Sequence, residues 1–180
     1  MKIAITGSAG TGKSTLAAAL GERLGVSVVP EGMREYLERS GVNLHDLGPD
    51  GLRDLVLELW REREPLEAVE GFVADRCSVD FAAFWLFYRF EHDPRTTQLQ
   101  AAFSAHARRY DYVIMLPHGG ITLASDGVRT TNTWTQLHFQ ILVEGMVERM
   151  VAPERVLQVP SRCCSMASRL DWLMPRLQPR

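Results

Sequence analysis

The feature that most constrains the fold of this chain is a glycine-rich stretch near its N-terminus. Residues 7–15 read GSAGTGKST and have the spacing G-x-x-x-x-G-K-S, which is typical of a phosphate-binding loop. A short β-branched run at residues 2–6 precedes the loop and predicts a buried strand. Residues 16–24 follow it and are strong helix formers. A strand, a glycine-rich turn and a helix occur in the order that a phosphate-binding loop requires. This order disfavours the alternative of a glycine-rich turn that precedes a helix but binds no phosphate.

The residue types of this stretch suit the phosphates of a nucleotide. Gly7 and Gly12 permit backbone angles that other residues avoid, so main-chain N–H groups can approach phosphate oxygens. The ammonium of Lys13 can reach the outer phosphates, and the hydroxyl of Ser14 can ligate Mg²⁺. We therefore expect ATP and Mg²⁺ as cofactors. The predicted nucleotide-binding residues of the loop are Gly7, Ser8, Ala9, Gly10, Thr11, Gly12, Lys13, Ser14 and Thr15.

Composition excludes several other classes of protein. The 180 residues are 46% hydrophobic, enough for one domain with a substantial core. A formal net charge of −2 gives no basic surface for nucleic acid, and no apolar run reaches the length of a membrane span. We expect no signal peptide, because residues 2–6 already predict a strand, and the three cysteines have no metal-ligand spacing. We expect a cytoplasmic monomer or homodimer with no nucleic-acid or membrane partner.

Strand and helix patterns alternate along the rest of the chain. Further strands are predicted at residues 26–29, 72–75, 112–116 and 156–159. Helices are predicted at residues 34–39, 52–69, 79–90, 96–109, 134–150 and 166–177, with a loop at 43–51. This alternation predicts an α/β fold in which a parallel sheet is covered by helices on both faces. The polar segment 117–132 is longer than an ordinary connection and is therefore a candidate lid.

Acidic side chains follow two of the predicted strands at their carboxyl ends, where parallel sheets bind their ligands. Asp75 can hold Mg²⁺ or accept a proton from a substrate hydroxyl, although an aspartate at this place can also cap a helix. Glu31 can act as a general base or hold the hydroxyls of an acceptor, and its alternative is a solvated loop charge. The position at the sheet edge favours a functional role for both carboxylates.

Several arginines could meet the phosphates. Arg129 lies in the candidate lid, within the sequence DGVR, and could close over the nucleotide to neutralise charge on a transferring phosphoryl group. Its alternative is a surface turn built on Asp-Gly. Arg34, Arg76 and Arg129 could converge on phosphates. Arg162, after the last predicted strand, is expected to border the adenine.

Aromatic residues and histidines receive simpler interpretations. The helix predicted at 79–90 is strongly aromatic and mostly core, with Phe81 and Trp85 as candidates for the wall of an acceptor pocket near Asp75. The histidines have no metal-ligand spacing and are interpreted as surface or loop residues. They are His45, His92, His106, His118 and His138.

Four stretches span nearly the whole chain in a fixed order. They are GSAGTGKST at 7–15, PEGMREYLE at 30–38, FVADRCSVDFAAFW at 72–85, and YDYVIMLP at 110–117 followed by DGVR at 126–129. In this order they resemble the P-loop nucleoside and nucleotide kinases, and more narrowly the small AAA-type ATPases of the NadR-like ribosylnicotinamide kinase family. The chain departs from that pattern where Cys77 follows Asp-Arg, and where Gln136 and His138 stand in place of an arginine after the lid.

The resemblance implies a three-layer P-loop NTPase fold with a five-stranded parallel sheet in the order 2-3-1-4-5. Residues 1–180 would form a single kinase-like domain with its lid at about 117–132. The implied activity is ATP-dependent transfer of the γ-phosphate to a hydroxyl of a small molecule, for which a nucleoside such as ribosylnicotinamide is a candidate. The alternative is a P-loop ATPase that acts as a switch or a partner-binding module without a small acceptor.

The resemblance also implies roles for individual residues. The implied catalytic residues are Lys13, Asp75, Glu31 and Arg129, and the implied metal ligands are Ser14 and Asp75. Together with Glu31, the residues proposed above from their positions give the predicted substrate-binding set, which is Glu31, Arg34, Arg76, Phe81 and Trp85.

Overall fold

The computed structural model of the chain describes residues 1–119 and 132–178. Its strands are β1 (Lys2–Thr6), β2 (Ser27–Val29), β3 (Phe72–Asp75), β4 (Tyr112–Met115) and β5 (Val156–Gln158). They form one sheet in the order β2-β3-β1-β4-β5, and every neighbouring pair is parallel. The predicted fold class and strand order are thus confirmed.

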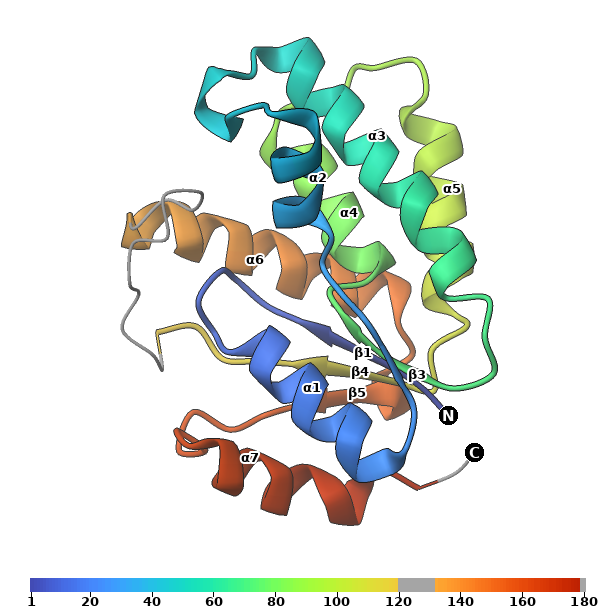
Figure 1. Ribbon diagram of the computed structural model, residues 1–180, viewed down its shortest axis with the longest axis vertical. Helices are drawn as coiled ribbons and strands as arrows, with labels where there is room; N and C mark the ends of the chain where they lie inside the picture. The colour runs from blue at the N-terminus through green and yellow to red at the C-terminus, as the bar shows by residue number, and fades with distance from the viewer. Residues whose placement is uncertain (120–131, 179–180) are drawn as a thin grey trace.

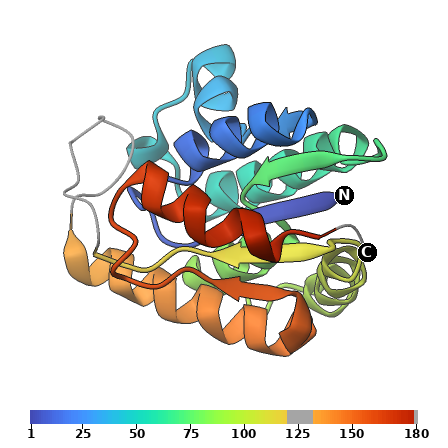
Figure 2. The same cartoon turned by 90° about the horizontal axis from the view of Figure 1, so that it is seen from below.

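Helices cover both faces of this sheet (Figures 1 and 2). They are α1 (Lys13–Leu24), α2 (Met33–Ser40), α3 (Pro49–Leu66), α4 (Ser78–Phe87), α5 (Thr96–Ala107), α6 (Thr133–Met150) and α7 (Met166–Leu173). Helices α1 and α7 lie on one face, and α4 and α6 lie on the other (Figure 1). Helices α2, α3 and α5 pack farther out, against α4.

The central strands β1, β3 and β4 are largely buried on both sides, whereas the edge strands β2 and β5 are partly exposed. Successive side chains of a strand point to opposite faces. Ile3 and Ile5 therefore pack against Leu20 of α1, whereas Ala4 packs on the side of Val143 of α6. This burial on two faces is what a parallel sheet covered by helices requires.

A third apolar cluster joins the outer helices to α4. The ring of Trp60 in α3 meets those of Phe81 and Phe103 edge-on, with centroids 5.4 and 4.9 Å away. The indole N–H of Trp85 donates to Thr96 Oγ1 at 2.9 Å. Phe81 and Trp85 are thus buried core residues that join α4 to its neighbours.

Two differences from the predicted boundaries occur next to prolines. Helix α3 begins at Pro49, within the predicted loop 43–51, because proline is compatible with the first turn of a helix. The same predicted loop also contains a 3₁₀ turn at Leu44–Asp46. Helix α7 ends at Leu173 and continues only as the 3₁₀ turn Met174–Arg176.

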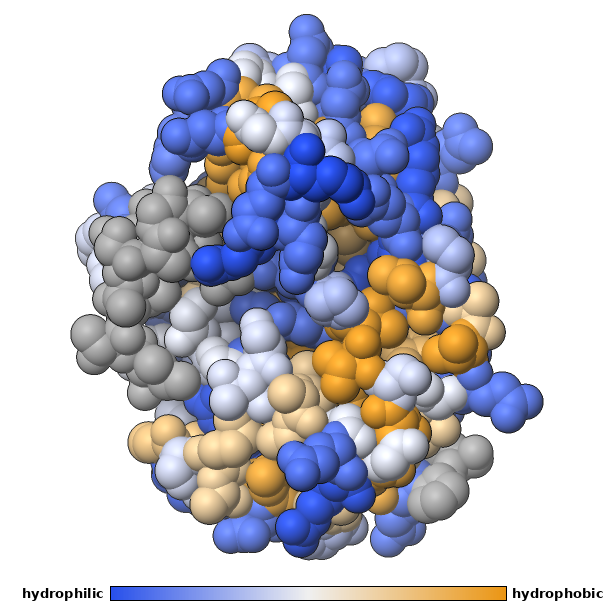
Figure 3. Space-filling model, in the orientation of Figure 1, coloured by the Kyte–Doolittle hydropathy of each residue, from blue (hydrophilic) through white to orange (hydrophobic). Residues whose placement is uncertain are grey.

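One face of the molecule carries polar residues over the outer helices and apolar residues around α1 (Figure 3). Among the residues described, none of the helices combines the length and the apolar character needed to span a membrane.

Candidate nucleotide and acceptor site

The loop between β1 and α1 has the conformation that its glycines predict. Gly7, Gly10 and Gly12 have φ angles of 135°, 72° and 87°, which residues with a Cβ rarely adopt. A Cβ at Gly7 would also lie 3.0 Å from the carbonyl oxygen of Leu116, which directly follows β4. Helix α1 begins at Lys13, so the free N–H groups of its first turn lie at this loop. The loop is therefore built as an anion-binding site.

Lys13 is buried and contacts its own loop. Its Nζ donates to the carbonyl oxygen of Ser8 at 2.7 Å. Burial, and then the charge of Arg76, lower the pKa of Lys13 from 10.5 to about 8. A bound phosphate would oppose both effects, because its negative charge favours the protonated amine. Nucleotide binding should therefore be coupled to the protonation of Lys13.

We predict that ATP affinity falls as the pH rises above about 8, where free Lys13 loses its proton. The expected slope approaches about tenfold per pH unit, because only the protonated amine attracts phosphate. Calorimetric titration between about pH 7.5 and 9.5, in buffers of different ionisation enthalpy, would measure both the affinity and the proton uptake. An affinity that stays constant over this range, with no proton uptake, would show that Lys13 does not titrate there.

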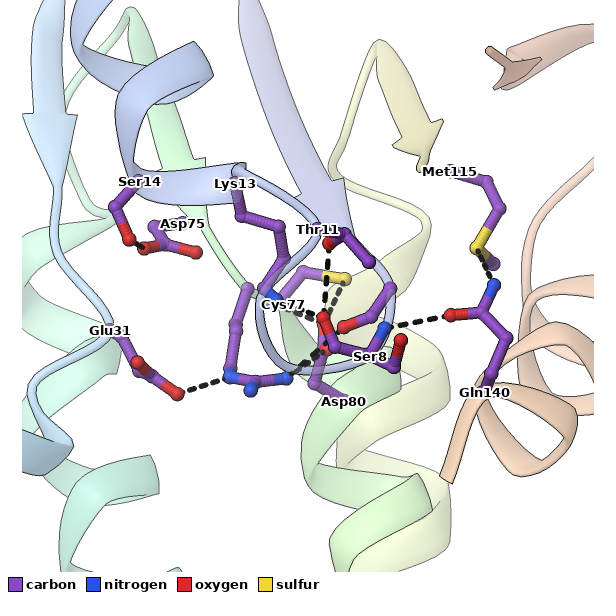
Figure 4. A network of polar contacts seen from close by, with 12 residues as sticks. Ser8, Thr11, Lys13, Ser14, Glu31, Asp75, Cys77, Asp80, Met115 and Gln140 are labelled. Atoms are coloured by element: carbon purple, nitrogen blue, oxygen red, sulfur yellow. Dashed lines mark hydrogen bonds and ion pairs between the residues drawn. The ribbon is translucent and has the colours of Figure 1, made fainter. Parts of the chain in front are cut away.

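Ser14 and Asp75 form a pair beside the loop (Figure 4). The hydroxyl of Ser14 donates to Asp75 Oδ2 at 2.5 Å. Asp75 is 3% exposed, and its Oδ1 is buried without a hydrogen-bond partner among the described residues. A hydroxyl and a carboxylate with an oxygen to spare match the hard oxygen ligands of Mg²⁺. The helix-cap interpretation of Asp75 does not hold, because the N-cap of α4 is Cys77.

Arg76 joins Glu31 to the same edge of the sheet. Its Nε donates to Glu31 Oε1 at 2.5 Å, and its Nη1 donates to Asp80 Oδ1 at 3.0 Å. Burial opposes the charge of Arg76, but the carboxylates of Glu31 and Asp80 outweigh it and hold the pKa of Arg76 above its usual range. The guanidinium is thus fixed between two carboxylates and orients Glu31.

Glu31 lines two separate hollows. One, of about 330 Å³, is shared with Ser14 and Asp75, and we call it the phosphate-side hollow. The other, of about 370 Å³, lies between α2, α4 and α6, and we call it the acceptor cavity. Its apolar lining includes Met33, Leu52, Phe84, Phe87, Tyr88 and Phe139. Phe81 and Trp85, which were predicted as wall residues, are not among the residues that line this cavity.

The structure brings together only some of the predicted site residues. The loop residues, Glu31, Asp75 and Arg76 meet at one edge of the sheet. Arg34 lines the phosphate-side hollow and is exposed. Arg162 is exposed after β5. Arg129 lies outside the described residues.

Two polar residues that sequence reasoning missed hold the loop from outside. Arg169 of α7 is 2% exposed and donates to the carbonyl oxygens of Thr11 and Cys163, at 2.6 and 3.1 Å. Gln140 of α6 accepts a hydrogen bond from the N–H of Ser8 at 2.7 Å (Figure 4). Both lie far along the chain from the loop and in no motif. In the sequence, each could have been noticed only as a polar residue at a helix position that otherwise faces the core.

His106 contradicts the interpretation of all five histidines as surface or loop residues. It lies in α5, is buried, and has its Nε2 2.7 Å from Glu67 Oε2. A buried carboxylate partner makes this burial favourable. His45, His92 and His138 are exposed, as expected.

The fold and this site define a P-loop nucleotide-binding protein. A family model described as an AAA domain matches residues 2–162, and the chain belongs to that family. No curated protein matches the chain.

Solved structures of nucleoside kinases share the fold. Deoxyadenosine kinase from M. mycoides, with dCMP and dCDP bound, has a TM-score of 0.67 at 18% identity, over 98% of each chain. The NadR protein in complex with NAD and AMP-PNP has a TM-score of 0.68 at 13% identity. That match covers 99% of this chain but 51% of NadR, so the chain spans about half of that protein. The family model and these structures confirm the predicted resemblance at the level of the fold, which the chain shares with P-loop nucleoside kinases and with NadR.

Proposed function

We propose that the protein is an ATP- and Mg²⁺-dependent kinase that transfers the γ-phosphate to a hydroxyl of a nucleoside-like small molecule. The observation that carries this proposal is the position of Glu31, which lines both the phosphate-side hollow and the acceptor cavity. An acceptor hydroxyl held by Glu31 would lie next to the residues that suit phosphate and metal. The fold shared with deoxyadenosine kinase and NadR supports the same conclusion.

The roles of the phosphate-side residues follow from their chemistry. Lys13 and the loop N–H groups bind and orient the phosphates of ATP. Ser14 Oγ and Asp75 are the proposed ligands of Mg²⁺, which when bound would neutralise charge on the transferring phosphoryl group. We further propose that Arg162 borders the adenine, and that residues 117–132 act as a lid carrying Arg129 within a single kinase-like domain.

The acceptor cavity favours a nucleoside over a nucleoside monophosphate. Its aromatic side chains suit the face of a planar ring. Arg76 is the only lysine or arginine among the described residues that line it, and this guanidinium already pairs with Glu31 and Asp80. The single positive charge of Arg76 faces the two negative charges of Glu31 and Asp80, so this group has a net negative charge. A net negative charge disfavours a phosphate on the acceptor and is compatible with an uncharged or cationic ring. Ribosylnicotinamide, whose ring is cationic, is therefore the specific acceptor that we propose.

The proposal is tested by incubating the protein with γ-labelled ATP, Mg²⁺ and a panel of acceptors. The panel contains ribosylnicotinamide, uncharged nucleosides, nucleoside monophosphates and small alcohols. We expect label on a nucleoside and little on the monophosphates. Label that appears only in inorganic phosphate, whatever the acceptor, would favour a P-loop ATPase that acts as a switch or partner-binding module.

We predict that Glu31→Gln weakens the acceptor and leaves ATP affinity nearly intact. The amide removes the charge that holds acceptor hydroxyls, so KM for the acceptor should rise about tenfold or more. Steady-state kinetics with each substrate varied in turn would separate the two effects. Glu38→Gln, which removes an exposed carboxylate from the same stretch of chain, is the matched control. Loss of kcat at saturating acceptor, with KM unchanged, would instead assign Glu31 as the base.

A further inference from the structure

A buried arginine lies behind the carboxyl ends of two strands. Arg63 of α3 is 3% exposed, and its guanidinium donates to three backbone carbonyl oxygens. Nη2 donates to Pro30 at 2.9 Å and to Asp75 at 2.6 Å, and Nη1 donates to Arg76 at 2.8 Å. The first carbonyl follows β2, and the other two lie at the end of β3. One side chain therefore ties together the ends of two neighbouring strands.

The hydrogen bonds from Arg63 take the place of backbone pairing between β2 and β3, which cannot continue beyond the end of β2. The last register pair between β2 and β3 is Val29 with Ala74. Pro30 follows β2 directly, and it has no N–H with which to continue the ladder. Without Arg63 the buried contacts of the Asp75 and Arg76 carbonyl oxygens, and the part-buried contact of the Pro30 carbonyl oxygen, would be lost, which is costly for the buried groups. The planar fork of Arg63 supplies donors to both strands at once.

Other buried groups hold Arg63 in place. Glu67, one turn later, is 1% exposed and accepts from Arg63 Nη1 at 2.9 Å. It also accepts from the hydroxyl of Tyr110 at 2.9 Å and contacts His106 Nε2 at 2.7 Å. Burial opposes the charge of Glu67, but the hydrogen bond from His106 and the charge of Arg63 lower its pKa below the usual value. The guanidinium therefore has a fixed anionic partner.

We infer that Arg63 is a positioning residue that sets the spacing of Glu31, Asp75 and Arg76. This inference rests on the proposed phosphotransfer. Glu31 follows Pro30 directly, and the other two residues are bound by Arg63 through their own carbonyl oxygens. The three side chains face the site while Arg63 holds the backbone behind them.

The backbone of Arg76 gives this inference a visible marker. Its φ of 68° lies in the left-handed region, which residues other than glycine adopt uncommonly. Its N–H donates to Ile5 at 2.9 Å, and its carbonyl oxygen accepts from Arg63. Removing Arg63 should release one of these two constraints and let the Arg76–Glu31 pair move. A displacement of about 1 Å at a catalytic group can cost about a hundredfold in rate.

The test compares Glu67→Gln with the double variant Arg63→Met/Glu67→Gln. Both variants keep an acceptor for His106 and Tyr110 and avoid an unpaired buried carboxylate. Glu67→Gln keeps the fork of Arg63 but removes the carboxylate that pairs with it, and the double variant removes the fork together with its charge. We expect kcat of the double variant to fall at least about tenfold below that of Glu67→Gln. The KM for ATP should change less than about threefold, because Arg169 and Gln140 hold the loop independently.

Two further measurements separate positioning from a general loss of stability. Val147→Ala, in the α6 core, is the stability control and should keep its kcat below its melting temperature. Crystal structures of both Glu67 variants would show whether Arg76 leaves the left-handed region. Equal kcat values, or an unchanged Arg76–Glu31 contact in the double variant, would overturn the inference. If the wild type phosphorylates no acceptor, the proposed function fails, and the two crystal structures alone decide the role of Arg63.

Discussion

Lys13→Ala is expected to remove most nucleotide binding and turnover. Lys13 is the buried cation of the phosphate loop, and its contact with the Ser8 carbonyl holds it there. Loss of a preorganised cation that neutralises phosphate charge should lower kcat/KM for ATP by about a hundredfold or more. Calorimetric binding and steady-state hydrolysis would measure the two losses.

The control for this variant is Lys2→Ala, which removes the only other lysine of the chain. Lys2 is partly exposed at the start of β1, at the opposite end of that strand from the loop, and its removal should leave ATP affinity unchanged. If Lys13→Ala bound and turned over ATP as the wild type does, the assignment of the loop would fail.

Asp75→Asn is expected to lower kcat by about two orders of magnitude or more. Phosphoryl transfer needs positioning and charge neutralisation more than a strong base, so a proposed metal ligand acts mainly in the transition state. The amide keeps the shape of Asp75 but loses its charge, so half-maximal activity should also require more Mg²⁺. Single-turnover rates across a Mg²⁺ titration would measure both effects.

Asp171→Asn, on the exposed side of α7, is the matched control for the loss of one carboxylate. An active Asp75→Asn enzyme, together with an inactive Glu31→Gln enzyme at saturating acceptor, would reverse the two proposed roles. Glu31 would then be the better candidate for the base.

The fold could be predicted from the sequence because it depends on local patterns and on a general rule for connecting parallel strands. The loop glycines require positive φ, and the alternation of strands and helices requires a parallel sheet. The same rule predicts that Glu31 and Asp75, at the ends of β2 and β3, lie at one edge. Their separation and their partners depend on Arg76, whose pairing with Glu31 joins residues 45 positions apart.

What sequence reasoning missed depends on contacts between distant segments. Helix α4 is apolar on nearly all sides, so no periodicity distinguishes the core residues Phe81 and Trp85 from Phe84, which lines the cavity. Arg63 and Arg169 look like surface residues of an arginine-rich chain. Their burial is evident only once the carbonyl groups that they bind are placed. Arg129 stays a prediction, because it lies outside the described residues.

The central claim is that the γ-phosphate of ATP passes to a nucleoside-like acceptor. The most direct test measures phosphorylated acceptor and ADP in the same reaction, with γ-labelled ATP and a nucleoside at saturation. The account predicts that the two products form in equimolar amounts, that ADP formation depends on the acceptor, and that Asp75→Asn lowers both together. ADP that forms at the same rate without acceptor, with all of the label in inorganic phosphate, would contradict it.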